Sequence, residues 1–121
     1  MTPSPVYVSI TGLKLKAFYH APRFWGHALR AMAQAQSAPG CLQAGSRTIN
    51  GIHHTRTVWS EKSCMQAYLI TGAHLDAMTS FHAFATGKTI GFETRDIPDW
   101  NDVHRIWLER GVDVGPAASE Y

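Results

Sequence analysis

The stretch Thr57–Met78, TVWSEKSCMQAYLITGAHLDAM, contains the pattern that decides the fold. Its β-branched beginning predicts a strand that ends at Trp59. Ser60 follows as a good N-cap for a helix over residues 61–70. The switch from strand to helix within a few residues is typical of a domain that packs helices against a sheet.

The second half of the same stretch predicts a break in the helix. Gly72 interrupts the pattern, and residues 73–85 are expected to continue as another helical piece. His74 stands just after the break. A histidine in that position can point into a pocket while the flanking helices hold its backbone in place, so it is the first candidate for chemistry.

The residues before Thr57 predict two further strands, a long helix and a tight turn. They are a strand over Val6–Leu15, a helix from Pro22 that ends at Pro39-Gly40, a strand over Cys41–Ile49 with a possible bulge at Gly45, the Asn50-Gly51 turn, and a strand over His53–Trp59. The alternation of Val6, Val8 and Ile10 with polar residues indicates that one face of the first strand is buried. Asn-Gly is a strong hairpin signal, so the last two strands are expected to be antiparallel partners.

The residues after position 85 predict one more strand and one more helix. They are a strand over Thr89–Arg95 that ends before Pro98, a helix over Trp100–Arg110 capped by Asp99, and a C′ glycine at Gly111. Trp100, Val103, Ile106 and Trp107 form the apolar stripe of that helix. The tail from Val112 onward is expected to be frayed.

The resulting order, β-α-β-β-α-β with an extra C-terminal helix, predicts an α+β ferredoxin-like split βαβ fold. We expect a single domain over residues 1–121, with an ordered core at about 6–112. In this fold the helices cover one face of the sheet, and the sequence offers no further layer for the other face, although the terminal helix can cap its own sheet or a neighbour's. A second copy is the simplest cover, which predicts a homodimeric α/β barrel.

Composition excludes several classes of protein. Of 121 residues, 17% are charged, which leaves a rather apolar surface and favours a homodimer. The net charge is +2 and the basic residues are scattered, so no nucleic-acid partner is expected. No stretch is long and apolar enough for a membrane span. Cys41 and Cys64 lack metal-site spacing and are expected to be free, partly buried thiols in a cytoplasmic protein.

These residues resemble a known group of proteins, the dimeric α/β-barrel superfamily that contains the antibiotic biosynthesis monooxygenase-like proteins. The resemblance rests on the stretch after Thr57, on Gly72-Ala73-His74, on Ile97-Pro98-Asp99-Trp100 and on the upstream run FWGHALRAMAQAQSAPG. Within the superfamily, the sequence looks most similar to spheroidene monooxygenase-like proteins and to a related domain family of unknown function. The likeness covers roughly residues 6–112, and its diffuse motifs indicate a fold more than an activity.

The resemblance implies two alternatives for the cofactor, none or haem. Some members of the superfamily are cofactor-free oxygenases, and some bind haem. Haem-degrading members carry a haem-ligating histidine one helical turn beyond the position of His74, where this chain has Met78. Haem is therefore a possible cofactor, bound through His74 or with Met78 as a soft ligand, but a copied haem-degradation mechanism is not expected. The alternative role for His74 is a structural one, in which it binds backbone groups and supports the break at Gly72.

Four more residues are candidates for ligand binding, and each also has a structural interpretation. Tyr7 is on the polar face of the first strand, and Arg56 is a mid-strand arginine that needs either a carboxylate such as Glu93 or an anionic ligand. Trp59 and Tyr68 can line an aromatic pocket, although tryptophans at these spacings are more often core or interface. Strand register, which sequence cannot give, determines which face of the third strand joins Tyr7.

The other histidines give no metal site. His53 and His54 are adjacent in a strand, so their side chains point to opposite faces and cannot chelate one ion. His53 is interpreted as part of a solvated hairpin tip. His20, His27, His82 and His104 are separated without ligand-like spacing.

Taken together, the sequence predicts a monooxygenase-like protein that binds a small apolar ligand or haem in the space between sheet and helices. In that role His74 handles a proton or ligates iron, and Tyr7, Arg56, Trp59, Tyr68 and Met78 bind the ligand. The alternative is a non-catalytic ligand-binding or interaction module with the same fold.

Overall fold

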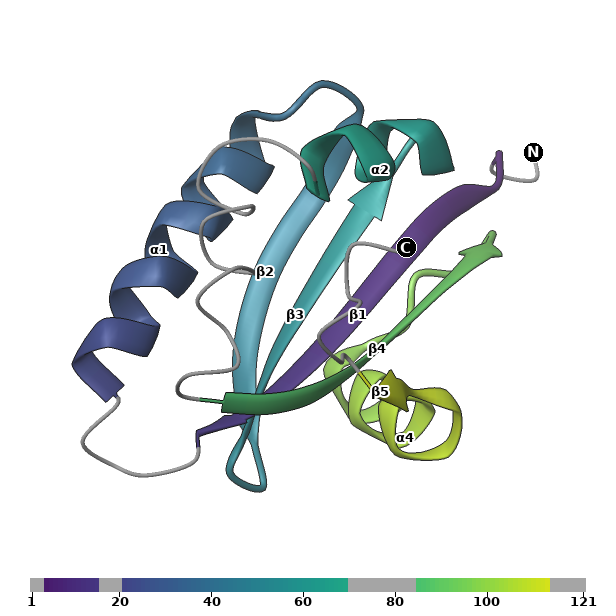
Figure 1. The fold of residues 1–121 in the computed structure, drawn as a ribbon. Helices are drawn as coiled ribbons and strands as arrows, with labels where there is room; N and C mark the ends of the chain where they lie inside the picture. Colours follow the sequence, from purple (N-terminus) through teal and green to yellow (C-terminus); the bar gives the residue numbers. More distant parts are fainter. Residues whose placement is uncertain (1–3, 16–20, 70–84, 114–121) are drawn as a thin grey trace.

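Alternation of apolar and polar residues along the strands builds one antiparallel sheet. The structure, a computed structural model, describes residues 4–15, 21–69 and 85–113. The five strands are ordered β2-β3-β1-β4-β5 (Figure 1). They are β1 (Val6–Leu15), β2 (Cys41–Ile49), β3 (Ile52–Trp59), β4 (Ala85–Thr94) and the short β5 (Val112–Asp113).

The first strand is central in the sheet. β1 lies between β3 and β4 and pairs with both in the antiparallel sense. With β1 inside and β2 at one edge, the element order β-α-β-β-α-β is the ferredoxin-like one, so the predicted α+β fold class is confirmed. Asn50 adopts a left-handed backbone conformation with φ 51° in the β2–β3 turn, as an Asn-Gly hairpin requires.

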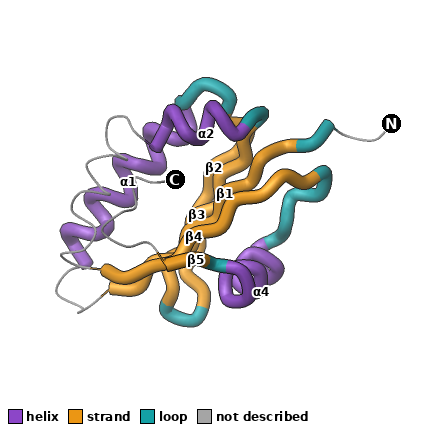
Figure 2. Tube along the Cα trace, turned by 45° about the vertical axis from the view of Figure 1, so that its right-hand side comes forward, coloured by secondary structure: helices purple, strands orange, loops and turns teal. Residues whose placement is uncertain are grey.

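Helices lie on both sides of the sheet. Figure 2 shows α1 (Ala21–Ser37) and α2 (Lys62–Leu69) on one side and α4 (Trp100–Arg110) on the other. We call these sides the inner face and the outer face, respectively. The outer face carries the aliphatic residues Val8, Ile10 and Val58, which pack against Val103 and Trp107 of α4. The inner face carries a second, more aromatic cluster around Trp59 and Tyr68.

The prediction that the chain has no further layer for the other face of the sheet is therefore wrong, and the open question of which sheet the terminal helix covers is answered. The apolar stripe of α4 packs on the outer face of its own sheet, so the terminal helix covers the face that was expected to need a partner. The helix begins as predicted, because the Asp99 carboxylate accepts a hydrogen bond from the backbone N–H of Asp102 at 3.0 Å. No helix in the described part of the chain is long and apolar enough to cross a membrane.

Several element boundaries differ from the sequence-based expectations. The second helix begins at Lys62, so Ser60 lies two residues before it and is not adjacent to it. The bulge in β2 lies between Cys41 and Gln43 and not at Gly45. β4 begins four residues earlier than expected, at Ala85.

The chain after α4 also differs from its prediction. Val112 and Asp113, expected to be frayed, pair with β4 as β5. Gly111 has φ −63°, which any residue can adopt, so it is not the left-handed C′ glycine that was expected. A side chain at this position would meet the carbonyl oxygen of Trp107 and the side chain of Lys88, which is the steric reason for glycine there.

The contact between Trp107 and Gly12 sets how closely α4 approaches the sheet. The indole ring of Trp107 lies over the backbone of Gly12 in β1, in the space that any Cβ at position 12 would fill. The indole N–H donates a hydrogen bond of 2.8 Å to the carbonyl oxygen of Lys88 in β4. A glycine in the middle of a strand normally weakens it, so its presence here reflects close packing.

Gly12→Ala is expected to lower the free energy of unfolding by about 1–3 kcal/mol, because the added methyl group collides with the Trp107 ring and forces α4 outward. Gly26→Ala in α1 is the matched control. Nothing lies within 4 Å of a Cβ there, and alanine favours a helix by about 0.5–1 kcal/mol over glycine. Urea unfolding of both variants checks this. Equal urea midpoints for Gly12→Ala and the wild-type chain would show that α4 can move away from the sheet without loss of stability.

Candidate functional site

The inner face is built from alternate residues of β1 and β3. Tyr7 stands opposite Trp59, Ser9 opposite Thr57, and Thr11 opposite Thr55. This register answers the question that sequence left open, because it places Trp59 and the two threonines on the same side as Tyr7. The inner face therefore has aromatic side chains at one end and hydroxyl groups along its middle.

An aromatic cluster joins the inner face to both helices. Trp59 is fully buried, and the centroid of its ring lies 5.2 Å from that of Tyr68 in α2. The Tyr68 hydroxyl donates a hydrogen bond of 3.0 Å to the carbonyl oxygen of Ala31 in α1. Burial, with a smaller contribution from nearby Cys41, raises the pKa of Tyr68, so the phenol stays protonated and remains a donor. Tyr68 thus fixes α1 and α2 over Trp59.

The indole N–H of Trp59 is the exception in this cluster. Its Nε1 atom is buried, and it has no hydrogen-bond partner in the part of the chain that the structure describes. A buried donor without an acceptor costs about 1–3 kcal/mol, so native proteins rarely leave one. An N–H in this state can donate to an oxygen atom that the described residues do not supply.

Hydroxyl groups form the middle of the inner face. The side-chain oxygens of Thr11 and Thr89 lie 3.4 Å apart across β1 and β4, and Thr89 donates to the carbonyl oxygen of Ile10. The structure records no hydrogen bond between the hydroxyls of Ser9, Thr55 or Thr57 and any described residue. This surface can therefore bind polar atoms as well as apolar ones.

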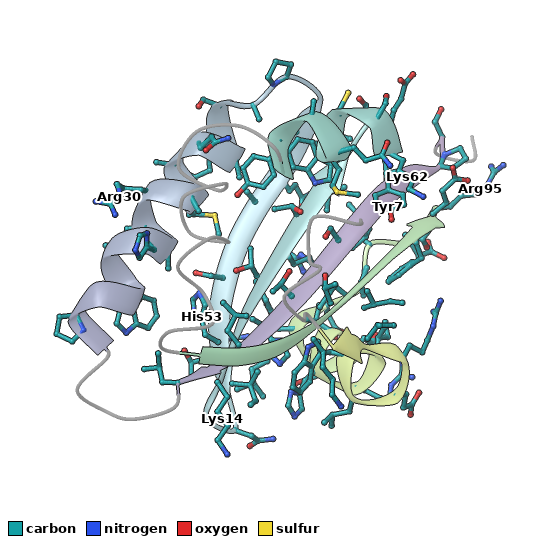
Figure 3. All side chains as sticks on the ribbon, in the orientation of Figure 1. Tyr7, Lys14, Arg30, His53, Lys62 and Arg95 are labelled. Carbon is teal, nitrogen blue, oxygen red and sulfur yellow. The ribbon has the colours of Figure 1, made fainter. Side chains whose placement is uncertain are left out.

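Tyr7 lies at the same end of the inner face as Trp59. Its phenol ring crosses to β4, where the hydroxyl occupies the space that a Cβ at Gly91 would fill. Figure 3 shows Tyr7 and Lys62 side by side, with the lysine nitrogen 5.9 Å from the centroid of the phenol ring. Burial, and secondarily the carboxylate of Glu93, raises the pKa of Tyr7. The group is thus a neutral phenol at neutral pH.

His53 occupies the other end of the inner face. It was expected at a solvated hairpin tip, but only 7% of it is exposed, so that prediction is wrong. Figure 3 shows it on the side of the sheet that faces α1, where its ring lies edge-on to Trp25 with the centroids 4.7 Å apart. Burial lowers its pKa, so the imidazole is neutral at neutral pH. Its period-two spacing with Thr55, Thr57 and Trp59 was the sequence signal for this orientation.

The structure brings together three of the predicted ligand-binding residues, because Tyr7, Trp59 and Tyr68 share one cluster. Arg56 lies on the outer face instead. Its guanidinium donates a hydrogen bond of 2.8 Å to the carbonyl oxygen of Pro98 and lies 4.7 Å from the centroid of the Trp100 ring. The sequence had suggested Glu93 or an anionic ligand as the partner of Arg56. Glu93 stands opposite Tyr7 in the β1–β4 register and therefore lies on the inner face. Arg56 therefore supports the docking of α4.

Two predicted residues, His74 and Met78, lie outside the described residues, as do Gly72 and the helical piece expected after it. The haem prediction depends on this pair, so it stays a prediction. Among the described residues, no group of three or more histidine, cysteine, aspartate or glutamate side chains is arranged to hold a metal ion. Cys41 and Cys64 are free thiols of intermediate exposure, as expected.

Comparison with known proteins rests on structure alone, because no protein-family model and no curated protein sequence matches this chain. SnoaB, a cofactor-independent oxygenase from Streptomyces nogalater, superimposes with a TM-score of 0.63 at 16% identity, over 79% of this chain and 100% of SnoaB. A candidate antibiotic biosynthesis monooxygenase from Deinococcus radiodurans gives a TM-score of 0.67 at 15% identity, over 77% of this chain and 96% of the other.

A third similar structure has no stated activity. It is a conserved protein from Methanosarcina mazei, with a TM-score of 0.61 at 8% identity over 76% of this chain and 94% of the other. At such identities the similarity shows the fold alone. The chain has the fold of the antibiotic biosynthesis monooxygenase-like proteins, as predicted. The nearer likeness to spheroidene monooxygenase-like proteins stays a prediction.

Tyr68→Phe is expected to lower the free energy of unfolding by about 1 kcal/mol, because it removes the hydrogen bond that joins α2 to α1. Tyr7→Phe is the matched control and should be nearly neutral, since no hydrogen bond of its hydroxyl to a described residue is recorded. Chemical unfolding of both variants measures the difference. Similar losses in the two variants would mean that the Tyr68 hydroxyl does not join the helices.

Proposed function

We propose that this protein is a monooxygenase-like protein that binds a small aromatic ligand between the inner face and helices α1 and α2. The observation that carries the proposal is the buried indole N–H of Trp59, which has no acceptor among the described residues. A ligand oxygen at that position would satisfy the donor and recover the cost of leaving it without a partner. Tyr7 and Tyr68 would hold the ligand ring beside it.

The chemistry of the inner face indicates the kind of ligand. Aromatic side chains at the Trp59 end favour a planar apolar ring. The hydroxyls of Ser9, Thr55 and Thr57 favour oxygen substituents on that ring, which adds polar atoms to the apolar ligand expected from sequence. His53 lies six residues from Trp59 along β3, about 20 Å at about 3.3 Å per residue, so only an elongated ligand would contact both ends.

Oxygenation without a cofactor requires that the substrate itself supply the electrons. A substrate with an acidic CH2 group between aromatic rings, such as an anthrone, meets this requirement after it loses a proton. In the overall reaction the CH2 carbon becomes a carbonyl, one atom of O2 stays on that carbon, and the other leaves as water with both hydrogens. The N–H of Trp59 would donate to the substrate oxygen that gains negative charge after deprotonation.

The proton acceptor in this proposal is His74, on the sequence evidence alone. Haem remains the alternative cofactor, with His74 or Met78 as the ligand. Titration with haemin separates the two possibilities: a Soret band that appears on binding and is lost in His74→Ala would support haem, and its absence would leave the cofactor-free reaction.

The rival proposal is a non-catalytic ligand-binding module on the same fold. The Methanosarcina mazei protein shares the fold and has no stated activity, so the fold does not decide between them.

We also propose that the protein is a cytoplasmic homodimer. Six large apolar side chains of the described residues remain exposed in one copy, among them Leu29, Leu42, Leu108 and Val112, and they support association. The two free thiols fit a reducing compartment.

The test uses a dihydroxyanthrone as the probe, with oxygen uptake as the measure of turnover and anaerobic calorimetry as the measure of binding. Trp59→Phe keeps an aromatic ring but removes the N–H, and it is expected to lower kcat by about 10²-fold or more. Trp25→Phe, at the far end of the inner face, is the matched control and should leave turnover unchanged. Binding without oxygen uptake would support the binding module, and absence of binding would overturn the ligand site.

A further inference from the structure

A chain of hydrogen bonds on the outer face joins four parts of the structure through two histidines. His54 in β3 is fully buried, and its Nε2 lies 2.8 Å from Nδ1 of His104 in α4. His54 Nδ1 lies 3.3 Å from the carbonyl oxygen of Thr11 in β1. His104 Nε2 lies 3.3 Å from Nδ2 of Asn50 in the β2–β3 turn. The two imidazoles therefore connect α4 to both central strands and to a hairpin turn.

The partners determine which nitrogen carries each hydrogen. A carbonyl oxygen only accepts, so His54 Nδ1 carries a hydrogen and donates it to Thr11. His54 Nε2 is then an acceptor, and His104 donates to it from Nδ1. His104 Nε2 in turn accepts from the amide of Asn50. Every bond in the chain is made when both imidazoles are neutral.

There is room for only one hydrogen between the two facing nitrogens. When one of the two rings is protonated, it donates the single hydrogen across the 2.8 Å contact and the other ring accepts it, so the contact is kept. With both rings protonated, two N–H groups and two positive charges point at each other, and the contact cannot persist. The ring of Trp107 lies edge-on to His54, with the centroids 5.0 Å apart, and leaves His54 no alternative partner on that side.

The surroundings do not compensate added positive charge. On the strands beside the pair, Arg47 of β2 stands opposite His54, Lys88 of β4 stands opposite Gly12, and Lys14 of β1 follows Gly12 by two residues. His53 and Arg56 of β3 and Arg105 of α4 are close to the two histidines along the chain. The acidic groups of α4, Asp102 and Glu109, bind Arg105 on the exposed side of the helix. Burial and the neighbouring histidines lower the pKa of His54 to about 4, against a bond to Thr11 that raises it.

We propose that the His54–His104 pair is an acid-sensitive latch that keeps α4 on the sheet while the pair holds at most one added proton, and releases the helix when both rings are protonated. The folded chain holds a proton on His54 less readily than the unfolded chain, in which this group has its ordinary pKa of 6.5. Its contribution to stability is therefore complete above that pH and is lost as the pH falls toward about 4. Release of α4 would uncover Val8, Ile10 and Val58 on the outer face.

The experiment is amide hydrogen exchange of the full chain, followed by peptide and corrected for the intrinsic effect of pH. Between neutral pH and about pH 4, peptides from α4 are expected to exchange at least about tenfold faster, while peptides from β1 and β3 keep their protection. His104→Asn should abolish this acid sensitivity, because an amide can donate to neutral His54 and can turn its oxygen to accept from protonated His54. His27→Asn, which removes a histidine of α1, should behave like the wild-type chain.

Two results would overturn the latch. One is a wild-type α4 that is as protected at about pH 4 as at neutral pH. The other is simultaneous loss of protection in α4, β1 and β3, which is global acid unfolding and not local release. If His104→Asn does not fold at neutral pH, the comparison of α4 with the strands in the wild-type chain and in His27→Asn still decides between these results.

Discussion

Side-chain alternation along β1 is the constraint on which the rest of the structure depends. The strand is central and has a helical layer on each side, so its odd and even residues belong to different environments. Val8 and Ile10 build the outer core under α4. Tyr7 and Ser9 contribute to the inner face beneath α1 and α2. A shift of one residue in register would exchange the two sets, so both layers depend on the same pairing with β3 and β4.

The two faces consequently have different physical roles. The outer face is aliphatic, and most of its buried polar groups have partners, as in the His54–His104 contact and the Trp107 indole N–H, although Nε of Arg56 has none among the described residues. The inner face is aromatic and rich in hydroxyls, and one of its buried donors, the Trp59 indole N–H, has no partner in the described part of the chain. Buried polar groups that have hydrogen-bond partners determine how a helix docks. A buried donor without a partner inside an aromatic cluster supports a ligand site instead.

Structural similarity establishes the fold of this chain and not its function. The same fold is found in a cofactor-independent oxygenase and in a protein with no stated activity, at identities too low to carry residue roles across. The proposed activity therefore depends on particular atoms of this chain, chiefly Trp59 Nε1, and not on the fold.

Local pattern was sufficient to predict the four strands β1–β4, the long helix, the Asn50-Gly51 hairpin and the capped helix after Asp99, because each depends on residues close in the chain. It did not predict β5, whose pairing depends on β4. The fold class followed from the order of these elements. Four other features depend on contacts between residues far apart in sequence. They are the placement of α4 on its own sheet, the burial of His53, the separation of Arg56 from Tyr7 and the pairing of His54 with His104. Those contacts are set by strand register and helix docking, which only the tertiary structure decides, because an alternating sequence is compatible with either face until a partner covers it.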